Sequence, residues 1–356
     1  MRYITTLALA LFVAFGAIVV PSNALSPTLS VSARAAALID ADDGKILYEK
    51  NANERLPMAS TTKIMTALVA LESASLDTVV TVHPDAVGVE GSSVYLTAGE
   101  RLTLGELLYA LMLSSANDAA AAIAIALGGS VERFADMMND CAARLGLNGT
   151  SFKNPHGLDA EGHYTTALDL ARLTAHALKS DGFRRIASSY KQEISGPSGK
   201  RLLVNHNKLL RSYEGCIGVK TGYTKKTGRC LVSAAERNGL TLVAVTLNDG
   251  DDWRDHAAML DYGFEFFERV TLARSGQELA RLPVVNGEAV ALYAESELCL
   301  TLTRYGKEIS VRIESTVRFF WSTPSHGETV GRAVFYRGDT RLGEVRLIVR
   351  SINFKY

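Results

Sequence analysis

The sequence predicts an α+β fold, in which an antiparallel sheet is flanked by a helical cluster, followed by a small all-β domain. Three observations support this prediction. Strand-like segments occur near residue 36 and again from Ile217, helix-like segments fill the chain between them, and short alternating stretches follow Arg274. When strands come first and last around a run of helices, the two ends can pair in one sheet.

Length and charge limit the kinds of function to consider. The chain has 356 residues, which suggests roughly two domains and a sizeable core. Its 38 basic residues balance its 38 acidic residues. There is therefore no electrostatic case for nucleic acid as a partner.

The N-terminus has the pattern of a secretory signal peptide. Arg2 precedes an apolar run over residues 7–20, and small residues follow at Ser22 and Ala24. The run is shorter than the about 20 apolar residues that a membrane-spanning helix usually needs. We expect residues 1–24 to be a signal peptide cleaved after Ala24, with an uncleaved signal anchor as the alternative. In both cases the rest of the chain is exported and works outside the cytoplasm.

The first elements of the folded chain can be placed in order. Residues 36–50 contain two short apolar strands around Asp43-Gly44, which is a hairpin signal. Residues 60–71 place Ile64, Leu68 and Leu71 at helical spacing. The Leu- and Ala-rich residues 104–127 predict two helices with a break near residues 114–117.

The remaining elements of this first domain follow. Ser130 caps a predicted helix, and Thr165 or Thr166 caps another. Strands return near Ile217, and Asn238-Gly239 is a type I′ hairpin signal. A helix from residue 253 to about residue 268 closes this region, so we place the first domain at residues 25–274.

The C-terminal residues 275–356 read as a β-rich domain. Short alternating stretches such as "AVALYA" and "ISVRIES" are separated by Gly and Asn. This segment shows no nucleophile motif, metal-ligand cluster or phosphate-binding loop. The chain ends in "VRLIVRSINFKY", which contains no amphipathic helix with a basic face.

The four cysteines show neither CxxC spacing nor a paired metal-ligand pattern. Cys141 falls on the apolar face of a predicted helix, which favours a buried free thiol. Export permits a disulfide between Cys216 and Cys230, but we favour free thiols there as well. The role of Cys299 is left open.

Ser60 and Lys63 form the first candidate pair for chemistry. They lie three residues apart at a helix start, so their side chains share one face and can touch. A serine hydroxyl becomes a nucleophile when a base takes its proton, and a buried lysine can be that base if its pKa is lowered. The alternative is a helix-capping Ser60 beside an exposed Lys63.

Two later motifs favour the chemical interpretation. Ser115 and Asn117 fall at the break between two helices, and Lys220-Thr221-Gly222 falls in a predicted strand. The chain thus carries S-x-x-K, S-x-N and K-T-G in this order. Class A β-lactamases and penicillin-binding proteins typically carry the same order of motifs, with S-D-N as the middle one. Three such matches in the expected settings are hard to obtain by chance.

These residues resemble a known family, the low-molecular-weight penicillin-binding proteins that are D-alanyl-D-alanine carboxypeptidases of the S11 peptidase type. The resemblance extends over about residues 36–268. It is strongest in "PMASTTKIMTAL", "LMLSSANDAAAAIA", "NPHGLDAEGHYTTALDLARL" and "GVKTGYTKKTGRCLVSAAER". It implies a β-lactamase/DD-peptidase-like fold for the first domain, and the β-rich C-terminal region loosely resembles the second domain of these enzymes.

The resemblance also implies a role for each matching residue in a serine-type carboxypeptidase. Ser60 would attack the carbonyl between two D-alanines and form an acyl-enzyme, with Lys63 as the base. Ser115 would relay a proton to the leaving amine. Asn117 would hold the substrate and Lys63 in place.

The strand motif would bind the substrate. Lys220 would support the proton network, and Thr221 would help to grip the terminal carboxylate. Gly222 would leave room for the substrate along the strand, and the backbone N–H groups of Ser60 and Tyr223 would form the oxyanion hole. The implied partners are peptidoglycan stem peptides ending in D-Ala-D-Ala, with β-lactam antibiotics as inhibitors. No cofactor and no metal are expected.

Three other residues near these motifs carry weaker expectations. His156 in "PHGLD" is expected to shape a loop beside the site. Glu161 could act as a base for deacylation, although its loop reads mainly as scaffold. His206 stands where some relatives have an arginine that helps to bind the substrate carboxylate.

Two other functions remain as alternatives. A serine β-lactamase would acylate at the same serine, but the chain between Asn117 and Lys220 lacks the Glu-x-x-x-Asn spacing of class A enzymes. A catalytically silent penicillin-binding sensor or scaffold is the second alternative. The complete set of motif residues argues against it. Peripheral association with the membrane or the cell wall is left open.

Overall fold

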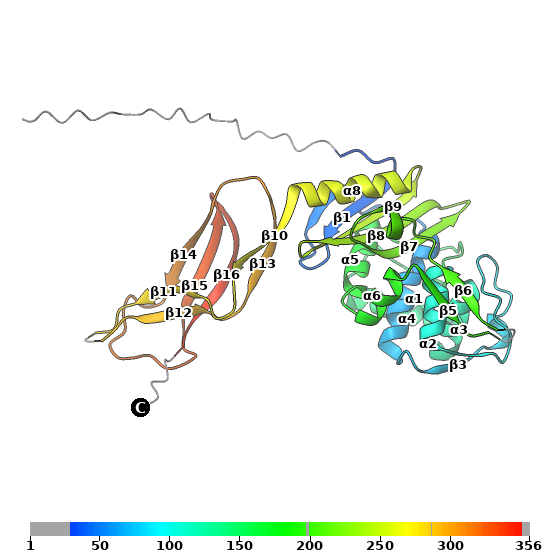
Figure 1. Ribbon diagram of the computed structural model, residues 1–356, viewed down its shortest axis with the longest axis horizontal. Helices are drawn as coiled ribbons and strands as arrows, with labels where there is room; N and C mark the ends of the chain where they lie inside the picture. The colour runs from blue at the N-terminus through cyan, green and yellow to red at the C-terminus, as the bar shows by residue number, and fades with distance from the viewer. Residues whose placement is uncertain (1–28, 197–198, 286, 351–356) are drawn as a thin grey trace, which may run out of the picture.

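The computed structural model describes residues 29–196, 199–285 and 287–350 (Figure 1). The predicted signal peptide at residues 1–24 lies outside the described residues. Two regions follow one another along the chain: an α+β part (residues 35–266) and a β-rich part (residues 267–349). The predicted fold class is confirmed. The domain boundary after residue 274 stays a prediction.

A five-stranded antiparallel sheet lies at the centre of the α+β part. Its strands are β1 (Ala35–Asp40), β2 (Ile46–Lys50), β7 (Cys216–Thr224), β8 (Gly228–Arg237) and β9 (Leu240–Asp249). The order across the sheet is β2-β1-β9-β8-β7, so the first strands of this part pair with the last ones. The expectation that both ends of this region share one sheet is confirmed, as are the two predicted hairpins.

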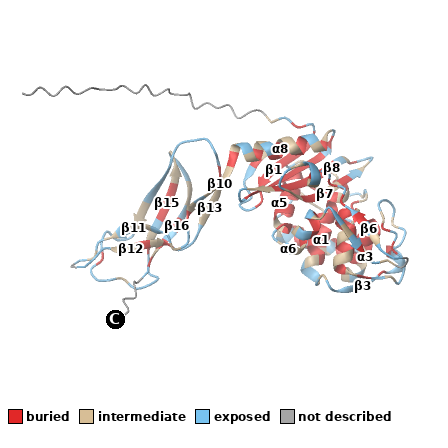
Figure 2. Ribbon diagram, in the orientation of Figure 1, coloured by how far each residue is buried: buried red, intermediate tan, exposed pale blue. Residues whose placement is uncertain are grey.

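The sheet is buried on both faces, and alternation along β9 shows how. Val243, Val245 and Leu247 belong to the larger core on the side of the helical cluster. Leu242 and Ala244 face the opposite way, into a second core beneath α8 (Asp252–Phe266). Successive residues of a strand point to opposite faces, so one strand serves both layers. Figure 1 shows α8 along one face of the sheet and helices α1 to α6 on the other side, and Figure 2 shows the buried residues concentrated between them.

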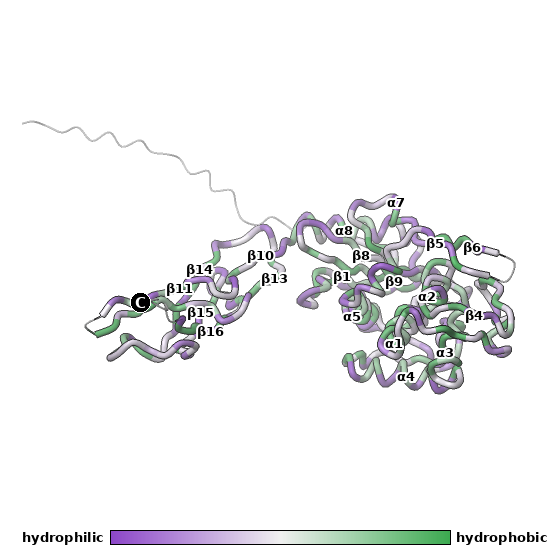
Figure 3. The backbone as a smooth tube through the Cα atoms, turned by 60° about the horizontal axis from the view of Figure 1, so that its bottom comes forward, coloured by the Kyte–Doolittle hydropathy of each residue, from purple (hydrophilic) through white to green (hydrophobic). Residues whose placement is uncertain are grey.

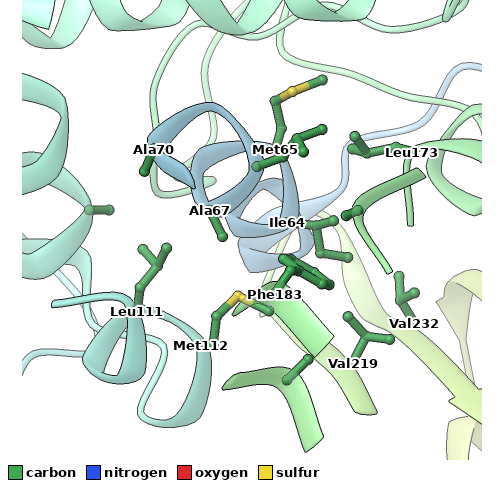
Figure 4. Close-up of a cluster of buried hydrophobic side chains, with 14 of the residues drawn as sticks. Ile64, Met65, Ala67, Ala70, Leu111, Met112, Leu173, Phe183, Val219 and Val232 are labelled. Carbon is green, nitrogen blue, oxygen red and sulfur yellow. The ribbon is translucent and has the colours of Figure 1, made fainter. Parts of the chain in front are cut away.

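The remaining helices form the cluster on the second face. They are α1 (Lys63–Ser73), α2 (Leu104–Leu113), α3 (Asn117–Gly128), α4 (Val131–Arg144), α5 (Ala167–Ala177) and α6 (Asp181–Ser188). The short helix α7 (Leu209–Ser212) instead contacts strand β7, and Tyr213 at its end donates to Asp261 of α8 at 2.7 Å. Helix α1 is buried almost all round: Figure 4 shows Ile64 and Met65 among apolar side chains of neighbouring helices and of the sheet. The start of α1 is therefore held rigidly on several sides.

Local capping sets several helix ends as the sequence predicted. Ser130 accepts a hydrogen bond from the backbone at the start of α4, and Thr166 does the same at α5. The predicted break between α2 and α3 is present at residues 114–116. Helix α8 ends at Phe266, slightly before the predicted end, because Phe267 already belongs to strand β10.

Short elements escaped the sequence analysis. They are the ribbon β3 (Val79–Thr81) with β4 (Arg101–Thr103) and the ribbon β5 (Lys191–Ile194) with β6 (Arg201–Val204). Each has three or four residues a strand, which is too short for a clear alternating pattern.

The β-rich part confirms the predicted all-β texture. It contains β10 (Phe267–Ala273) paired with β13 (Leu298–Thr303), and a sheet of β11 (Glu278–Leu282), β12 (Val290–Ala294), β16 (Thr340–Val349), β15 (Thr329–Arg337) and β14 (Ile309–Ser315). Its small core includes Leu292, Phe335 and Leu347. Figure 3 shows hydrophobic and hydrophilic stretches interleaved along these strands.

The two parts meet at the turn of the β1–β2 hairpin. Arg269 Nη1 lies 3.2 Å from Asp40 Oδ2 and 3.3 Å from Asp43 Oδ2. The Thr301 N–H donates to Asp43 at 2.9 Å, and Lys45 Nζ donates to the Thr301 carbonyl at 2.7 Å. Thr301 also donates its hydroxyl to Asp40. Because Asp40 is fully buried and burial raises its pKa, Arg269 and Thr301 are needed as its partners.

The four cysteines are all free thiols, as expected for Cys141, Cys216 and Cys230. Within the part of the chain that the structure describes, no helix is long and apolar enough to cross a membrane. Among those same residues, no group of histidine, cysteine, aspartate or glutamate side chains could hold a metal ion.

Candidate active site

Ser60 lies in a short turn at the entrance of the buried helix α1. A 3₁₀ turn over Ala59–Thr62 leads directly into α1, which begins at Lys63. Ser60 is therefore not a capping residue, and no side-chain capping bond starts either helix. The geometry leaves the Ser60 hydroxyl available to Lys63.

Lys63 is fully buried and directed at Ser60. Its Nζ lies 3.0 Å from Ser60 Oγ, 2.7 Å from Asn117 Oδ1 and 2.6 Å from the His156 carbonyl oxygen. Three acceptors match the three N–H bonds of an ammonium group. After loss of a proton the amine has a lone pair, and the Ser60 hydroxyl can then donate to it. The alternative of an exposed first-turn lysine is wrong.

The surroundings favour the neutral form of this lysine. Burial, and secondarily the charge of Lys220, lower the pKa of Lys63 well below its usual 10.5, and the nearby Asp118 carboxylate opposes this shift. Lys220 is itself buried, which lowers its pKa to about 7. Burial thus disfavours the charged form of both lysines, and at Lys63 the charge of Lys220 adds to this effect.

Ser115 and Asn117 occupy the break between α2 and α3. Ser115 has a positive φ of 59°, and it lines the same cavity as Ser60. Asn117 is anchored on both sides, because its Nδ2 donates to the Glu90 carbonyl at 2.5 Å and its N–H donates to the Ser92 carbonyl at 2.7 Å. This anchoring holds its Oδ1 against Lys63.

Strand β7 brings the third motif to the opposite side of Ser60. A Cβ built on Gly222 would lie 3.0 Å from the Ser60 nitrogen, so any side chain there would crowd the turn. Lys220 lies buried in the strand with its Nζ 2.9 Å from the Thr221 carbonyl, while Tyr223 is exposed. The strand therefore approaches the turn as bare backbone, which suits an extended ligand.

These groups surround an open cavity of about 640 Å³. Among the residues predicted for the site, Ser60, Ser115, Thr221, Gly222 and Tyr223 line it. The other three, Lys63, Asn117 and Lys220, lie buried beneath the wall. The further lining residues are Ser92, His206, Lys208, Arg229, Asp252 and Trp253.

The cationic and aromatic wall was not foreseen from the sequence. Lys208 Nζ lies 5.7 Å from the centre of the Trp253 ring, and Arg229 lies 3.4 Å from Asp252. These four residues come from three separate segments and match none of the three motifs, so no local signal could have identified them.

His156, Glu161 and His206, the three residues predicted to lie near the motifs, differ in their positions relative to the cavity. His156 contributes its carbonyl to Lys63, in keeping with a residue that shapes the loop. Glu161 is exposed and does not line the cavity, so it is badly placed to act as a base. His206 lines the cavity, and burial together with Lys220 lowers its pKa, so it is a poor replacement for a permanently charged arginine.

Two glycines of the site were also missed. A Cβ on Gly157 would lie 2.0 Å from the Ala59 carbonyl oxygen, and one on Gly91 would lie 2.8 Å from Asn117 Nδ2. Gly157 stands inside the "NPHGLD" stretch, so its motif was visible although its packing role was not.

A family model described as D-alanyl-D-alanine carboxypeptidase, peptidase S11, matches residues 21–251. The chain belongs to this family. The S11 chain is 35% identical over 328 residues to D-alanyl-D-alanine carboxypeptidase DacF of Bacillus subtilis, covering 89% of this chain and 84% of that protein. It is 33% identical to DacA of Escherichia coli K12 over 77% of this chain and 72% of the relative.

Solved structures give the same result for this S11 chain. Penicillin-binding protein 5 from Haemophilus influenzae superposes with a TM-score of 0.75 at 26% identity, covering 90% of this chain and 97% of that one. The Streptomyces K15 DD-transpeptidase superposes with a TM-score of 0.62 at 34% identity, covering 66% of this chain and 98% of that one. The first match extends over both parts of the fold.

Proposed function

We propose that this S11 protein is a serine-type D-Ala-D-Ala carboxypeptidase that removes the terminal D-alanine from peptidoglycan stem pentapeptides and is acylated by β-lactams. The observation that carries the proposal is the buried Lys63, held between Ser60 Oγ and Asn117 Oδ1 with its pKa lowered. The relatives named above are D-alanyl-D-alanine carboxypeptidases, which supports the same reaction.

Acylation begins with proton transfer from the Ser60 hydroxyl to neutral Lys63. The Ser60 oxygen then attacks the carbonyl carbon of the penultimate D-alanine and forms a tetrahedral intermediate. Its oxyanion accepts hydrogen bonds from the backbone N–H groups of Ser60 and Tyr223, which lie on facing segments. Ser115, on the third side of the cavity, relays the proton from Lys63 to the leaving amine as the C–N bond breaks, which leaves Lys63 neutral again.

The exposed backbone of strand β7 at Gly222 determines how the substrate binds. The peptide lies along β7 beside Gly222, where a side chain would collide with the Ser60 turn. Thr221 binds the terminal carboxylate at the cavity wall, and Asn117 positions both the substrate and Lys63. Lys220 supplies positive potential behind this wall and adds to burial in lowering the pKa of Lys63.

Water completes the cycle. It attacks the Ser60 ester, giving a proton to the Lys63 amine, and the shortened peptide leaves with the new carboxylate while Ser60 recovers its proton. A β-lactamase needs this step to be fast for a bulky penicilloyl group. Glu161 is exposed and outside the cavity, which favours the carboxypeptidase. A silent sensor is disfavoured because the proton network around Lys63 is complete.

The cellular setting completes the proposal. Residues 1–24 act as a signal peptide, and the protein works outside the cytoplasm, where its substrate is. Residues 25–274 form the catalytic domain and residues 275–356 a β-rich domain. Association with the cell wall or the membrane surface would bring the cavity to the stem peptides.

The test uses the purified protein, fluorescent penicillin and a peptide ending in D-Ala-D-Ala. Penicillin labelling and D-alanine release are expected for the wild type, and both are lost in Ser60→Ala. Ser73→Ala, at the far end of α1, is the matched control and keeps both activities. Rapid penicillin turnover without D-alanine release would indicate a β-lactamase, and stable labelling without release would indicate a sensor.

A further inference from the structure

The turn that carries Ser60 is held in an unfavourable backbone conformation. Ala59 has a φ of 46°, in the left-handed region that alanine seldom adopts. Such a conformation persists only where neighbouring groups enforce it. Two hydroxyls do so here, because Thr61 Oγ1 donates to the Met58 carbonyl at 2.6 Å and Thr62 Oγ1 donates to the Ala59 carbonyl at 2.7 Å.

The hydrogen bond from Thr62 to the Ala59 carbonyl affects the geometry of the proposed oxyanion hole. The Ala59 carbonyl and the Ser60 N–H belong to one planar peptide group. Whatever fixes the direction of the Ala59 oxygen therefore also fixes the direction of the Ser60 N–H. Gly157 closes in on the same carbonyl from the other side, where a Cβ would come within 2.0 Å of its oxygen.

His163 extends this support from outside the turn. The backbone N–H of Lys153 donates to His163 Nδ1 at 3.0 Å, so Nδ1 must be an acceptor. Nε2 therefore carries the hydrogen and donates to Thr62 Oγ1 at 2.8 Å. Thr62 in turn passes its own hydrogen to Ala59. The result is a one-way chain of hydrogen bonds from the Lys153 backbone to the peptide group of Ser60.

The imidazole keeps this polarity over the working pH range. His163 is buried, and burial lowers its pKa to about 4, so the ring stays neutral and Nδ1 remains an acceptor. Its other contact is an edge-on approach to Phe152, with ring centres 6.0 Å apart, which any aromatic ring could make. The bonds of its two nitrogens, from Lys153 to Nδ1 and from Nε2 to Thr62, are the part that requires a histidine.

We propose that His163 is a positioning residue that orients the oxyanion-hole donor of Ser60 through Thr62. The inference rests on the proposed function, since it assumes that the Ser60 N–H stabilises an oxyanion. That donor matters more in the transition state than in the bound substrate. Loss of His163 should therefore lower kcat and the penicillin acylation rate while leaving KM nearly unchanged.

The experiment is a double-mutant cycle on the full-length protein. His163→Phe keeps the contact with Phe152 but removes both ring nitrogens, the Nε2 donor to Thr62 and the Nδ1 acceptor from Lys153. Thr62→Val removes the hydroxyl at nearly the same volume. Each single change should slow acylation about tenfold or more, since losing one oxyanion donor outright costs about 10²–10³. The double variant should be no slower than the worse single variant, because both act on one chain of bonds.

His256→Phe is the matched control for the loss of a buried histidine. His256 is likewise buried between two hydroxyls, with Ser233 Oγ at 2.5 Å and Thr246 Oγ1 at 3.0 Å, but it belongs to helix α8, on the opposite face of the sheet from α1. We expect this control to lower the melting temperature and to leave the acylation rate per folded molecule unchanged. If His163→Phe behaves in the same way, or if the two single effects multiply in the double variant, the proposal is wrong.

Failure of the proposed function would look different. Penicillin and peptide both form a tetrahedral oxyanion at Ser60, so the cycle can be read with either one. A wild type that is labelled by penicillin but releases no D-alanine would overturn the carboxypeptidase function and still allow the cycle to be measured. A wild type in which Ser60 reacts with neither ligand would overturn both proposals.

Discussion

Lys63 Nζ lies 3.0 Å from Ser60 Oγ at the start of a helix that is buried on nearly every side. An ammonium in this position would bring a full charge into a buried site that already holds another buried lysine, Lys220. The main effect of these surroundings is therefore to lower the pKa of Lys63 and to favour its neutral form.

Replacing Lys63 with arginine should abolish acylation. Arginine keeps the positive charge but cannot give up its proton near neutral pH, so it cannot act as a base. We expect the penicillin acylation rate to fall by a factor of about 10³ or more. Stopped-flow measurement with fluorescent penicillin checks this, with exposed Lys179→Arg as the control. An active Lys63→Arg variant would show that Lys63 is not the base.

The pH profile should report the same lysine. Only the neutral amine is active, so acylation is lost as the pH falls through the pKa of Lys63, which lies well below 10.5. The Asp118 carboxylate raises this pKa, so Asp118→Asn should lower it and move the acid limb to lower pH. Acylation rates measured across the pH range test the sign, with exposed Asp136→Asn as the control. A limb that moves to higher pH would contradict the assignment.

Gly157 should tolerate no side chain. Gly157→Ala would place a Cβ 2.0 Å from the Ala59 carbonyl oxygen at a φ of 91°. Gly146→Ala is the matched control, because its φ is 70° but nothing lies within 4 Å of the added Cβ. We expect the control to cost about 1–2 kcal/mol in unfolding free energy and Gly157→Ala to cost more than about 3 kcal/mol. Penicillin labelling should fall in Gly157→Ala alone, and equal behaviour of the two variants would count against the contact.

The contact between the two parts of the chain depends on Arg269. Arg269→Met leaves the fully buried Asp40 without its cation, so we expect a loss of about 3–5 kcal/mol in unfolding free energy. Arg304→Met breaks a half-exposed pair with Glu268 and should cost less than about 1 kcal/mol. Chemical denaturation compares them. The Arg269 loss should shrink as the pH falls, because the unpaired carboxyl can take up a proton, and a loss that grows at low pH would refute this explanation.

Local sequence patterns predicted the structural features that depend on residues close together in the chain. The helix caps at Ser130 and Thr166, the hairpin at Asn238-Gly239 and the shared face of Ser60 and Lys63 all follow from spacings of a few residues. The turn before α1 was less predictable, because a 3₁₀ turn and the first turn of an α-helix have nearly the same residue preferences.

Contacts between distant residues had no such signal. Thr62 and His163 are separated by 101 positions, and Asp40 and Thr301 by 261. The first pair is brought together by packing within the α+β part and the second by the contact between the two parts, and a single histidine or threonine in a sequence does not indicate its partner. For the same reason, the cavity wall around Trp253 became visible only in three dimensions.

The unpaired thiols have a practical consequence. Cys230 lies opposite Gly222 in the register of β7 and β8, is buried, and has its pKa raised to about 12 by burial. A maleimide or similar reagent needs an accessible thiolate, so it should reach Cys230 only when strand β7 separates from the sheet. Cys230 thus lies on the strand next to the one that we expect to bind the peptide. Its alkylation rate with and without a bound β-lactam would show how much a ligand slows the separation of β7 from the sheet.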